Sequence, residues 1–264
     1  MDRWKQKIAN GEVLFGTHIT NADMHNAEIL GHCGYDYFWI DMEHTQITKH
    51  DVCDILLAAR AVGPDLATFV RVPILDPAQV KPILEMGPTG IIFPMIFTKE
   101  DVELAVSACS YPPKGIRGFS PRAAVRYGID STEEYVDTIN DRIWKLIQIE
   151  TKAAYENIDI LLENTDVDMF IMGPCDFSGA FGHLPDFKHP EVMEKIDEVF
   201  AKVKAAGRHI GVSIGAYDYE NVKLWIDKGV SMISVGSEPA FMIDGSKTAL
   251  GNLRKAFEDS RKAK

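Results

Sequence analysis

The sequence predicts an α/β protein folded as a (β/α)8 barrel, and three observations support this fold class. Eight apolar runs of strand length alternate with segments of helical periodicity along the whole chain. Several of these runs end abruptly in an acid, a His or an Arg, as expected for the C-terminal rim of a barrel enzyme. A doubly wound sheet is the alternative, but no GxGxxG motif follows the first strand.

The eight expected strands follow one another at intervals that leave room for a helix after each. Their side chains are largely apolar, as in a parallel sheet that is buried on both faces. Chemistry-bearing residues stand at the ends of several separate strands, which favours the barrel. The expected strands lie near residues 13–19, 36–42, 67–72, 90–95, 144–150, 168–173, 209–215 and 231–236.

The segments between the strands carry helix signals. From His189 to Gly207, a Pro stands near the start, apolar residues recur at helical spacing, and a Gly closes the segment. Residues 51–62 and 219–228 show a similar pattern. These signals predict helices that cover the outside of the barrel.

Length, composition and charge restrict the classes of protein. The chain has 264 residues and 46% apolar residues, which suits one barrel domain over residues 1–264. The net charge of −11 argues against nucleic-acid binding. Without a membrane span or the apolar core of a secretory signal, a cytoplasmic protein with no membrane partner is expected. Its four cysteines lack CxxC spacing and are expected to be reduced thiols.

One connection between strands is unusually long, from about residue 97 to residue 142. Two helices are expected in it, and the second starts at Ser131, where Glu134 three residues later completes a capping-box pattern. The stretch from Tyr111 to Arg122 lies between them, and structureless stretches of this length are usually functional loops or lids. The connection carries more Arg and Phe than a surface loop of an acidic protein needs, so we expect it to contact a neighbouring subunit. The residues concerned are Arg117, Phe119, Arg122 and Arg126.

Glu150 and Asp176 stand at the ends of neighbouring strands, so their carboxylates are expected to converge. Two carboxylates without Cys or clustered His suit a hard divalent cation, with water and substrate oxygens completing its coordination. The other interpretation is that each acid caps a following helix or forms an ion pair. The spacing alone leaves both interpretations open.

A second group of polar residues crowds the ends of the first three strands. His44 follows Asp41 and Glu43, and a His beside carboxylates can act as a general base near neutral pH, although it can equally be a structural side chain. Arg71 ends the third strand and is suited to hold a carboxylate or stabilise an enolate oxygen. It is equally suited to pair with Glu43 or another acid at the rim, and both can hold. His18, at the end of the first strand, is a weaker candidate.

Two more features bear on substrate binding and mechanism. The turn from Gly173 to Gly179 leads from a strand into a helix and is expected to expose N–H groups that suit a carboxylate. No Lys stands at the end of a strand, since Lys145 lies at the start of the fifth one. A Schiff-base mechanism therefore lacks a candidate lysine.

Six linked motifs follow one another along nearly the whole chain. They are Ile40-Asp41-Met42-Glu43-His44, Val70-Arg71-Val72-Pro73, Phe93-Pro94-Met95, Tyr111-Pro112-Pro113-Lys114-Gly115-Ile116-Arg117-Gly118, Gln148-Ile149-Glu150-Thr151 and Gly173-Pro174-Cys175-Asp176-Phe177-Ser178. This ordered set resembles the HpcH/HpaI aldolase family. Its best-known members are the metal-dependent 4-hydroxy-2-oxoheptanedioate (2,4-dihydroxyhept-2-ene-1,7-dioate) aldolases.

The resemblance implies a (β/α)8 barrel of the phosphoenolpyruvate/pyruvate type, assembled as a hexamer (a trimer of dimers) with the last helix exchanged between neighbours. It implies a class II aldolase that reversibly cleaves a 4-hydroxy-2-oxo acid to pyruvate and an aldehyde, with aromatic compound catabolism as an expected setting. A divalent metal ion, Mg²⁺, Mn²⁺ or Co²⁺, would be bound by Glu150 and Asp176. The alternatives are a citrate-lyase-like or malyl-CoA-type lyase, for which no basic cluster for coenzyme A is evident, and a non-catalytic barrel that binds an oxo acid.

The resemblance also implies roles for individual residues. His44 would serve the proton transfers, and Arg71 would steady the pyruvate oxygen as it becomes an enolate. The family's acid partner of the histidine falls on Glu85, where the better-known aldolases have Asp, and Asp41 is the other acid suited to that role.

Departures from the family pattern surround the aldehyde pocket. The first strand leads into Gly16–Asn21 instead of an aromatic-containing loop, Cys175 replaces a usual Ala, and Ser213 replaces an apolar residue that commonly touches substrate. A more polar pocket is expected, and the aldehyde itself does not follow from the sequence. The residues expected to line the substrate site are Arg71, Gln148, Gly173, Pro174, Cys175, Asp176 and Ser213.

Overall fold

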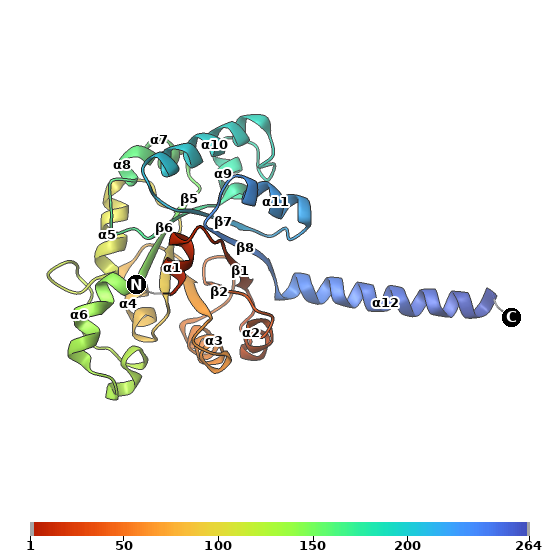
Figure 1. Ribbon diagram of the computed structural model, residues 1–264, viewed down its shortest axis with the longest axis horizontal. Helices are drawn as coiled ribbons and strands as arrows, with labels where there is room; N and C mark the ends of the chain where they lie inside the picture. The colour runs from red at the N-terminus through yellow and green to blue at the C-terminus, as the bar shows by residue number, and fades with distance from the viewer. Residues whose placement is uncertain (1–2, 263–264) are drawn as a thin grey trace.

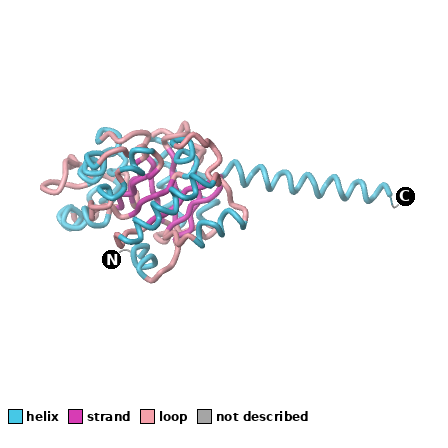
Figure 2. Tube along the Cα trace, turned by 90° about the horizontal axis from the view of Figure 1, so that it is seen from above, coloured by secondary structure: helices cyan, strands magenta, loops and turns pink. Residues whose placement is uncertain are grey.

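The structure, a computed structural model, describes residues 3–262. Eight parallel strands pair in chain order, and the last pairs with the first, so the sheet closes into a barrel. The strands lie at the centre with helices around them (Figures 1 and 2). The strands are β1 Leu14–Ile19, β2 Tyr37–Asp41, β3 Ala67–Arg71, β4 Gly90–Phe93, β5 Trp144–Ile149, β6 Met169–Met172, β7 Ile210–Ile214 and β8 Met232–Ser237.

The predicted (β/α)8 fold is confirmed, and each strand lies within a residue or two of its expected position. The expected ends of the domain, residues 1 and 264, lie outside the described residues. The helices, including one 3-10 helix, η1, are α1 Arg3–Ala9, α2 Met24–Gly31, α3 Lys49–Val62, α4 Pro77–Glu85, α5 Lys99–Cys109, η1 Ala123–Gly128, α6 Thr132–Arg142, α7 Lys152–Glu156, α8 Ile158–Leu161, α9 Pro174–Ala180, α10 Pro190–Ala205, α11 Tyr219–Asp227 and α12 Glu238–Lys262.

Large side chains fill the inside of the barrel. One buried apolar cluster draws members from seven of the eight strands, which is possible only if those side chains point to the barrel axis. Tyr37 occupies the space in front of Gly16, where an added Cβ would lie 2.3 Å from its ring. Trp39 belongs to the same cluster and forms part of the floor beneath the C-terminal opening of the barrel. A second, larger cluster packs the strands against the surrounding helices.

The long connection between β4 and β5 contains α5, η1 and α6. The Ser131 hydroxyl accepts a hydrogen bond from the Glu134 N–H, so it caps α6 as the sequence predicts. The Arg117 side chain is fully buried and pairs with Glu85. Arg126 pairs with Asp130. These two arginines therefore have partners in their own chain, and the expected contact of the connection with a neighbouring subunit stays a prediction.

Helix α12 leaves the barrel and projects away from it (Figures 1 and 2). It has 25 residues, and Glu238 is the one that is buried among those described. No described helix, α12 included, is long and apolar enough to cross a membrane. Exposed apolar side chains recur along α12 at roughly helical spacing, so one face of this helix is apolar and suited to contact with another apolar surface. They are Met242, Ile243, Leu250, Leu253 and Phe257.

Candidate active site at the barrel mouth

Arg71 is held by two acids at the C-terminal end of the barrel. Asp41 ends β2 and lies opposite Arg71, the last residue of β3, in the strand register. The Arg71 Nε lies 2.9 Å from Asp41 Oδ1, and its Nη2 lies 2.6 Å from Asp41 Oδ2. Its Nη1 lies 2.7 Å from Glu43 Oε2. The ion pair that the sequence left open is therefore formed.

Burial and the charge of Arg71 act in opposite directions on the pKa of each of these two acids, and the balance differs between them. Burial raises the pKa of Asp41, but the hydrogen bonds and charge of Arg71 outweigh it, so the pKa is lowered overall. For Glu43, burial is stronger than the charge of Arg71, and its pKa is raised. Asp41 is thus a firm anionic partner that fixes the guanidinium plane.

Trp39 supports Arg71 from within the barrel. The guanidinium carbon lies 5.3 Å from the centroid of the Trp39 ring, a cation–π contact. The ring of His18 meets the same indole edge-on, with centroids 5.6 Å apart. Trp39 is therefore a common floor for two polar groups of the mouth, a role that its position within an apolar strand did not indicate.

His44 lies at the rim, with 63% of its side chain exposed. Its Nε2 is 3.8 Å from Glu43 Oε2. The Asp41 carboxylate instead bonds to Arg71 and to the backbone N–H groups of residues 43 and 44, so it does not hold the His44 ring. The expectation that Asp41 orients this imidazole is therefore corrected, because the guanidinium occupies that carboxylate.

Glu85 lies at the C-terminal end of α4, away from the rim at which that helix begins. Its Oε1 accepts a hydrogen bond from Arg117 Nη2 at 3.1 Å, and its Oε2 is buried without a hydrogen-bond partner in the described part of the chain. The described chain therefore does not bring Glu85 to His44, and the pairing implied by the resemblance stays a prediction.

Glu150 follows β5 and is buried beneath the mouth. Its Oε1 accepts a hydrogen bond of 2.8 Å from the N–H of Met95, whose backbone has a φ of +52°. That conformation is costly for a residue with a side chain, and it aims the N–H at the carboxylate. The Gln148 amide donates to the other oxygen, Oε2. Gly173 is required beside them, since a Cβ there would lie 2.8 Å from Glu150 Oε2.

The pKa of Glu150 is raised by its surroundings at this end of the barrel. The pKa of Glu150 is raised to about 7, chiefly by burial, and further by the charges of Glu43 and Asp176, while the Met95 N–H opposes the shift. The charge of Asp176 thus acts on Glu150, and the shared metal site expected from the sequence stays a prediction. A divalent cation bound by these oxygen ligands would relieve the repulsion, so the residues present fit the expected metal.

The turn after β6 presents Asp176 from the first turn of α9. Pro174 is buried, whereas Cys175 and Asp176 are exposed at the mouth. The pKa of the Cys175 thiol is raised by partial burial and by the charge of Asp176. Cys175 is therefore a neutral, small polar group at neutral pH and not a thiolate nucleophile.

Three polar side chains from β1, β7 and β8 form a group that the sequence only partly revealed. His18 Nε2 lies 2.8 Å from Ser213 Oγ and 3.2 Å from Ser234 Oγ, while its Nδ1 lies 2.7 Å from the backbone oxygen of Gly236. Strands β1 and β7 are not neighbours in the sheet, so the bond between His18 and Ser213 must cross the barrel interior. The sequence singled out Ser213 and named His18 as a weaker candidate, but it did not single out Ser234, which lies opposite Ser213 on β8.

No lysine stands at the C-terminal end of any described strand. Lys145 is the second residue of β5, at the opposite end of the barrel, and its Nζ donates to the backbone oxygen of Asn140 at 2.8 Å. The expectation that this lysine is not catalytic agrees with its position.

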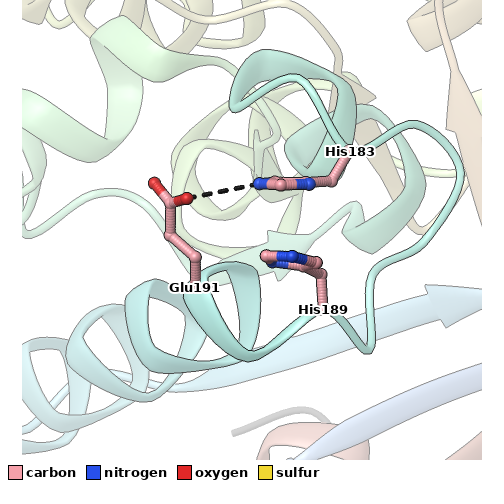
Figure 3. A group of neighbouring side chains, drawn as sticks. All are labelled: His183, His189 and Glu191. Atoms are coloured by element: carbon pink, nitrogen blue, oxygen red, sulfur yellow. Dashed lines mark hydrogen bonds and ion pairs between the residues drawn. The ribbon is translucent and has the colours of Figure 1, made fainter.

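A separate cluster of His183, His189 and Glu191 lies where α9 connects to α10 (Figure 3). The two imidazole rings are stacked, with centroids 3.5 Å apart and planes at 15°. His183 Nε2 lies 3.2 Å from Glu191 Oε2. Nitrogen lone pairs lie in the ring plane, so stacked rings direct them side by side instead of toward a common point. This arrangement suits ring stacking and an ion pair better than a metal site.

Comparisons with known proteins agree with this fold. Residues 14–244 match the HpcH/HpaI aldolase/citrate lyase family. The 2-dehydro-3,6-dideoxy-6-sulfogluconate aldolase of Pseudomonas putida is 33% identical over 240 residues, which cover 90% of this chain and 92% of that protein. The hydroxypyruvate/pyruvate aldolase of Roseovarius nubinhibens is 30% identical, over 95% of this chain and 96% of that protein.

A solved structure shows the same architecture. It is an HpcH/HpaI aldolase/citrate lyase family protein from Burkholderia cenocepacia, 30% identical, with a TM-score of 0.89 and coverage of 96% of this chain and 100% of that one. The family match and the aldolase relatives show that the protein is a lyase of the aldolase type. The chain belongs to the HpcH/HpaI aldolase/citrate lyase family, whose lyases cleave 4-hydroxy-2-oxo acids.

Proposed function

We propose that this aldolase binds pyruvate at the barrel mouth between Arg71 and the pair of carboxylates Glu150 and Asp176, and joins it reversibly to an aldehyde. The observation that carries this proposal is the electrostatic arrangement of the mouth. Burial and the charges of neighbouring acids raise the pKa of Glu43 and of Glu150 there, and Arg71 is a guanidinium that faces these acids. Such a site favours a cation together with a small anionic substrate.

Glu150 and Asp176 are the residues that would hold a divalent ion, for which Mg²⁺, Mn²⁺ and Co²⁺ are suitable because both ligands are carboxylates. When bound, such an ion supplies a Lewis acid for the keto group of an oxo acid. Glu150 is positioned for this before any ligand binds, because the Met95 N–H and the Gln148 amide orient its two oxygens. The carbonyl oxygen of Gln148 is buried without a partner among the described residues and can accept a donor from bound water.

Arg71 would bind the oxygen that becomes negatively charged when pyruvate is enolised. A guanidinium has five N–H groups, and two of those of Arg71 form hydrogen bonds with Asp41, while its Nη1 forms an ion pair with Glu43. The N–H groups that Asp41 does not engage can donate to substrate oxygens without breaking those two bonds. The positive charge is then fixed in place before the reaction, which is the arrangement that stabilises a transition state most effectively.

His44 would carry the methyl proton of pyruvate, directly or through water. Its ring lies at the exposed rim, 3.8 Å from Glu43, so it can reach a substrate that fills the mouth. Glu85 pairs with Arg117 inside its own chain. If Glu85 also orients a His44 ring, as the resemblance implies, we propose that it does so in a neighbouring subunit.

The proposed oligomer, a hexamer built as a trimer of dimers, would cover apolar surface that one chain leaves exposed. Helix α12 carries its exposed apolar face beyond the barrel, and over most of its length its side chains are exposed in the described part of the chain. The long connection adds Phe119, Tyr127 and Ile129, all strongly exposed. A second copy is the simplest partner for surfaces of this kind.

The function can be tested by incubating the protein with pyruvate, Mg²⁺, Mn²⁺ or Co²⁺ and a panel of aldehydes, with and without acetyl-CoA. We expect a 4-hydroxy-2-oxo acid to form without acetyl-CoA and to be cleaved back to its components. Condensation only in the presence of acetyl-CoA would favour the citrate-lyase-like alternative. Binding of pyruvate without any carbon–carbon bond formation would favour a non-catalytic barrel.

A further inference from the structure

The hydrogen bonds of His18 fix its tautomer. A backbone carbonyl can only accept, so the 2.7 Å contact with the oxygen of Gly236 places the ring proton on Nδ1. Nε2 must then be an acceptor for as long as the ring is neutral. Burial, assisted by the nearby charge of Arg71, lowers the pKa of His18 to about 4. The ring is therefore neutral at physiological pH.

The neutral His18 ring determines how Ser213 can bond. Ser213 Oγ lies 2.8 Å from Nε2, so the hydroxyl donates its single proton to the ring. Ser234 Oγ is farther away, at 3.2 Å, is fully buried, and has a second partner in the Tyr37 hydroxyl. Within the described part of the chain, His18 is the one hydrogen-bond partner of the Ser213 side chain. The Ser213 oxygen therefore keeps lone pairs but has no proton left to give.

The position of Ser213 makes those lone pairs accessible. Ser213 and His18 are partly exposed, whereas Ser234 beside them is buried. Glu150 and Asp176 follow β5 and β6, and Arg71 ends β3, so the proposed pyruvate site occupies that side of the mouth. The side formed by β7, β8 and β1 is left for the rest of the substrate. On this side of the mouth, the accessible polar groups at the level of Ser213 are its own hydroxyl and the ring of His18.

We propose that Ser213, held as an acceptor by His18, receives a hydrogen bond from a hydroxyl group of the substrate, so that the enzyme prefers hydroxylated substrates. The proposal rests on the proposed function and names its substrate class. The hydroxyl can belong to the aldehyde or to the oxo-acid nucleophile, since the two meet at the bond that forms. Ser213 is the specificity residue that would touch the substrate, and His18 is a positioning residue that acts through it.

The test compares substrates that differ by one hydroxyl group. One arm uses glycolaldehyde against acetaldehyde with pyruvate, and the other uses hydroxypyruvate against pyruvate with one aldehyde. We expect kcat/KM to favour the hydroxylated member in at least one arm, and this arm identifies the source of the hydroxyl. Ser213→Ala should reduce that preference about tenfold, the value of one hydrogen bond in a partly exposed site. Ser213→Thr, which keeps the hydroxyl, should restore it.

Three controls separate this inference from the proposed function. His18→Phe should also lower the preference, whereas Ser231→Ala, which removes a hydroxyl bonded to His209 at the opposite end of the barrel, should leave it unchanged. Exchange of the pyruvate methyl hydrogens with D₂O, which needs no aldehyde, should persist in Ser213→Ala. An unchanged preference in Ser213→Ala with exchange intact would overturn the role of Ser213. Absence of exchange in the unmodified protein would instead reject the proposed pyruvate chemistry.

Discussion

Asp41 and Arg71 lie opposite each other on adjacent strands and form two parallel hydrogen bonds, of 2.9 and 2.6 Å. The pair fixes both the position and the plane of the guanidinium at the mouth of the barrel. Trp39 packs on the inner side of Arg71. The N–H groups of Arg71 that Asp41 does not engage are therefore left to face the opening of the barrel. The consequence is a preorganised cation beside the proposed metal ligands.

The first prediction concerns this pair. Arg71→Lys keeps the charge but loses the planar fork, so we expect exchange of the pyruvate methyl hydrogens to fall about a hundredfold, equivalent to about 3 kcal/mol. Asp41→Asn should cause a smaller loss, because Arg71 keeps Glu43 but no longer has its bidentate partner. NMR of pyruvate in D₂O measures both rates. Exchange at the unmodified rate in Arg71→Lys would contradict the proposed role.

The second prediction concerns the carboxylates. Glu150→Ala and Asp176→Ala should each abolish aldol cleavage, because one remaining carboxylate makes a poor site for a divalent ion. The fold should persist, since neither residue belongs to the apolar core. Circular dichroism checks the fold, and the exposed Glu163→Ala serves as the control. Full cleavage by either variant at limiting metal would rule out this ligand assignment.

The third prediction separates the two known ways of activating pyruvate. A strong chelator should remove all activity, and added Mg²⁺, Mn²⁺ or Co²⁺ should restore it. Borohydride added together with pyruvate should leave the protein mass unchanged, because no lysine lies at the C-terminal end of a described strand, where a Schiff base could form. Mass spectrometry that finds pyruvate trapped on a lysine would refute the mechanism.

The fourth prediction concerns assembly. Light scattering should show an oligomer, and the double substitution Leu253→Glu and Phe257→Glu should dissociate it, because both side chains lie on the exposed apolar face of α12. Lys255→Glu on the same helix changes charge without touching that face and serves as the control. An active monomer of the unmodified chain would contradict the proposed assembly through α12 and the long connection.

The fifth prediction uses the pKa of His18, which is lowered from 6.5 to about 4. Between these values the unfolded chain binds a proton that the folded chain does not, so the free energy of unfolding decreases as pH falls from 6.5 to about 4. The largest contribution this allows is about 3 kcal/mol. His18→Gln should remove that part of the pH dependence in denaturant melts, and His50→Gln on the surface should not. Identical pH profiles for the unmodified protein and His18→Gln would refute the shift.

The sequence by itself determined the barrel and most of the groups at its mouth. Period and length identify the strands because a strand buried on both faces must be apolar, and a charged residue that ends it must lie at the rim. This reasoning placed Asp41, Arg71 and Glu150 at the ends of strands, where the structure has them. It also excluded a rim lysine.

Only the tertiary structure decided which of these groups bond to one another. Local sequence does not reveal that the Asp41 carboxylate bonds to Arg71 instead of to the His44 ring, or that Arg117 pairs with Glu85 in the same chain. The contact between His18 and Ser213 joins residues 195 positions apart through the barrel interior. Such contacts depend on closure of the sheet, which brings side chains from strands that are not neighbours into one shared space. Periodicity along the chain carries no information about distances across that space, so these bonds appear only once the barrel is closed.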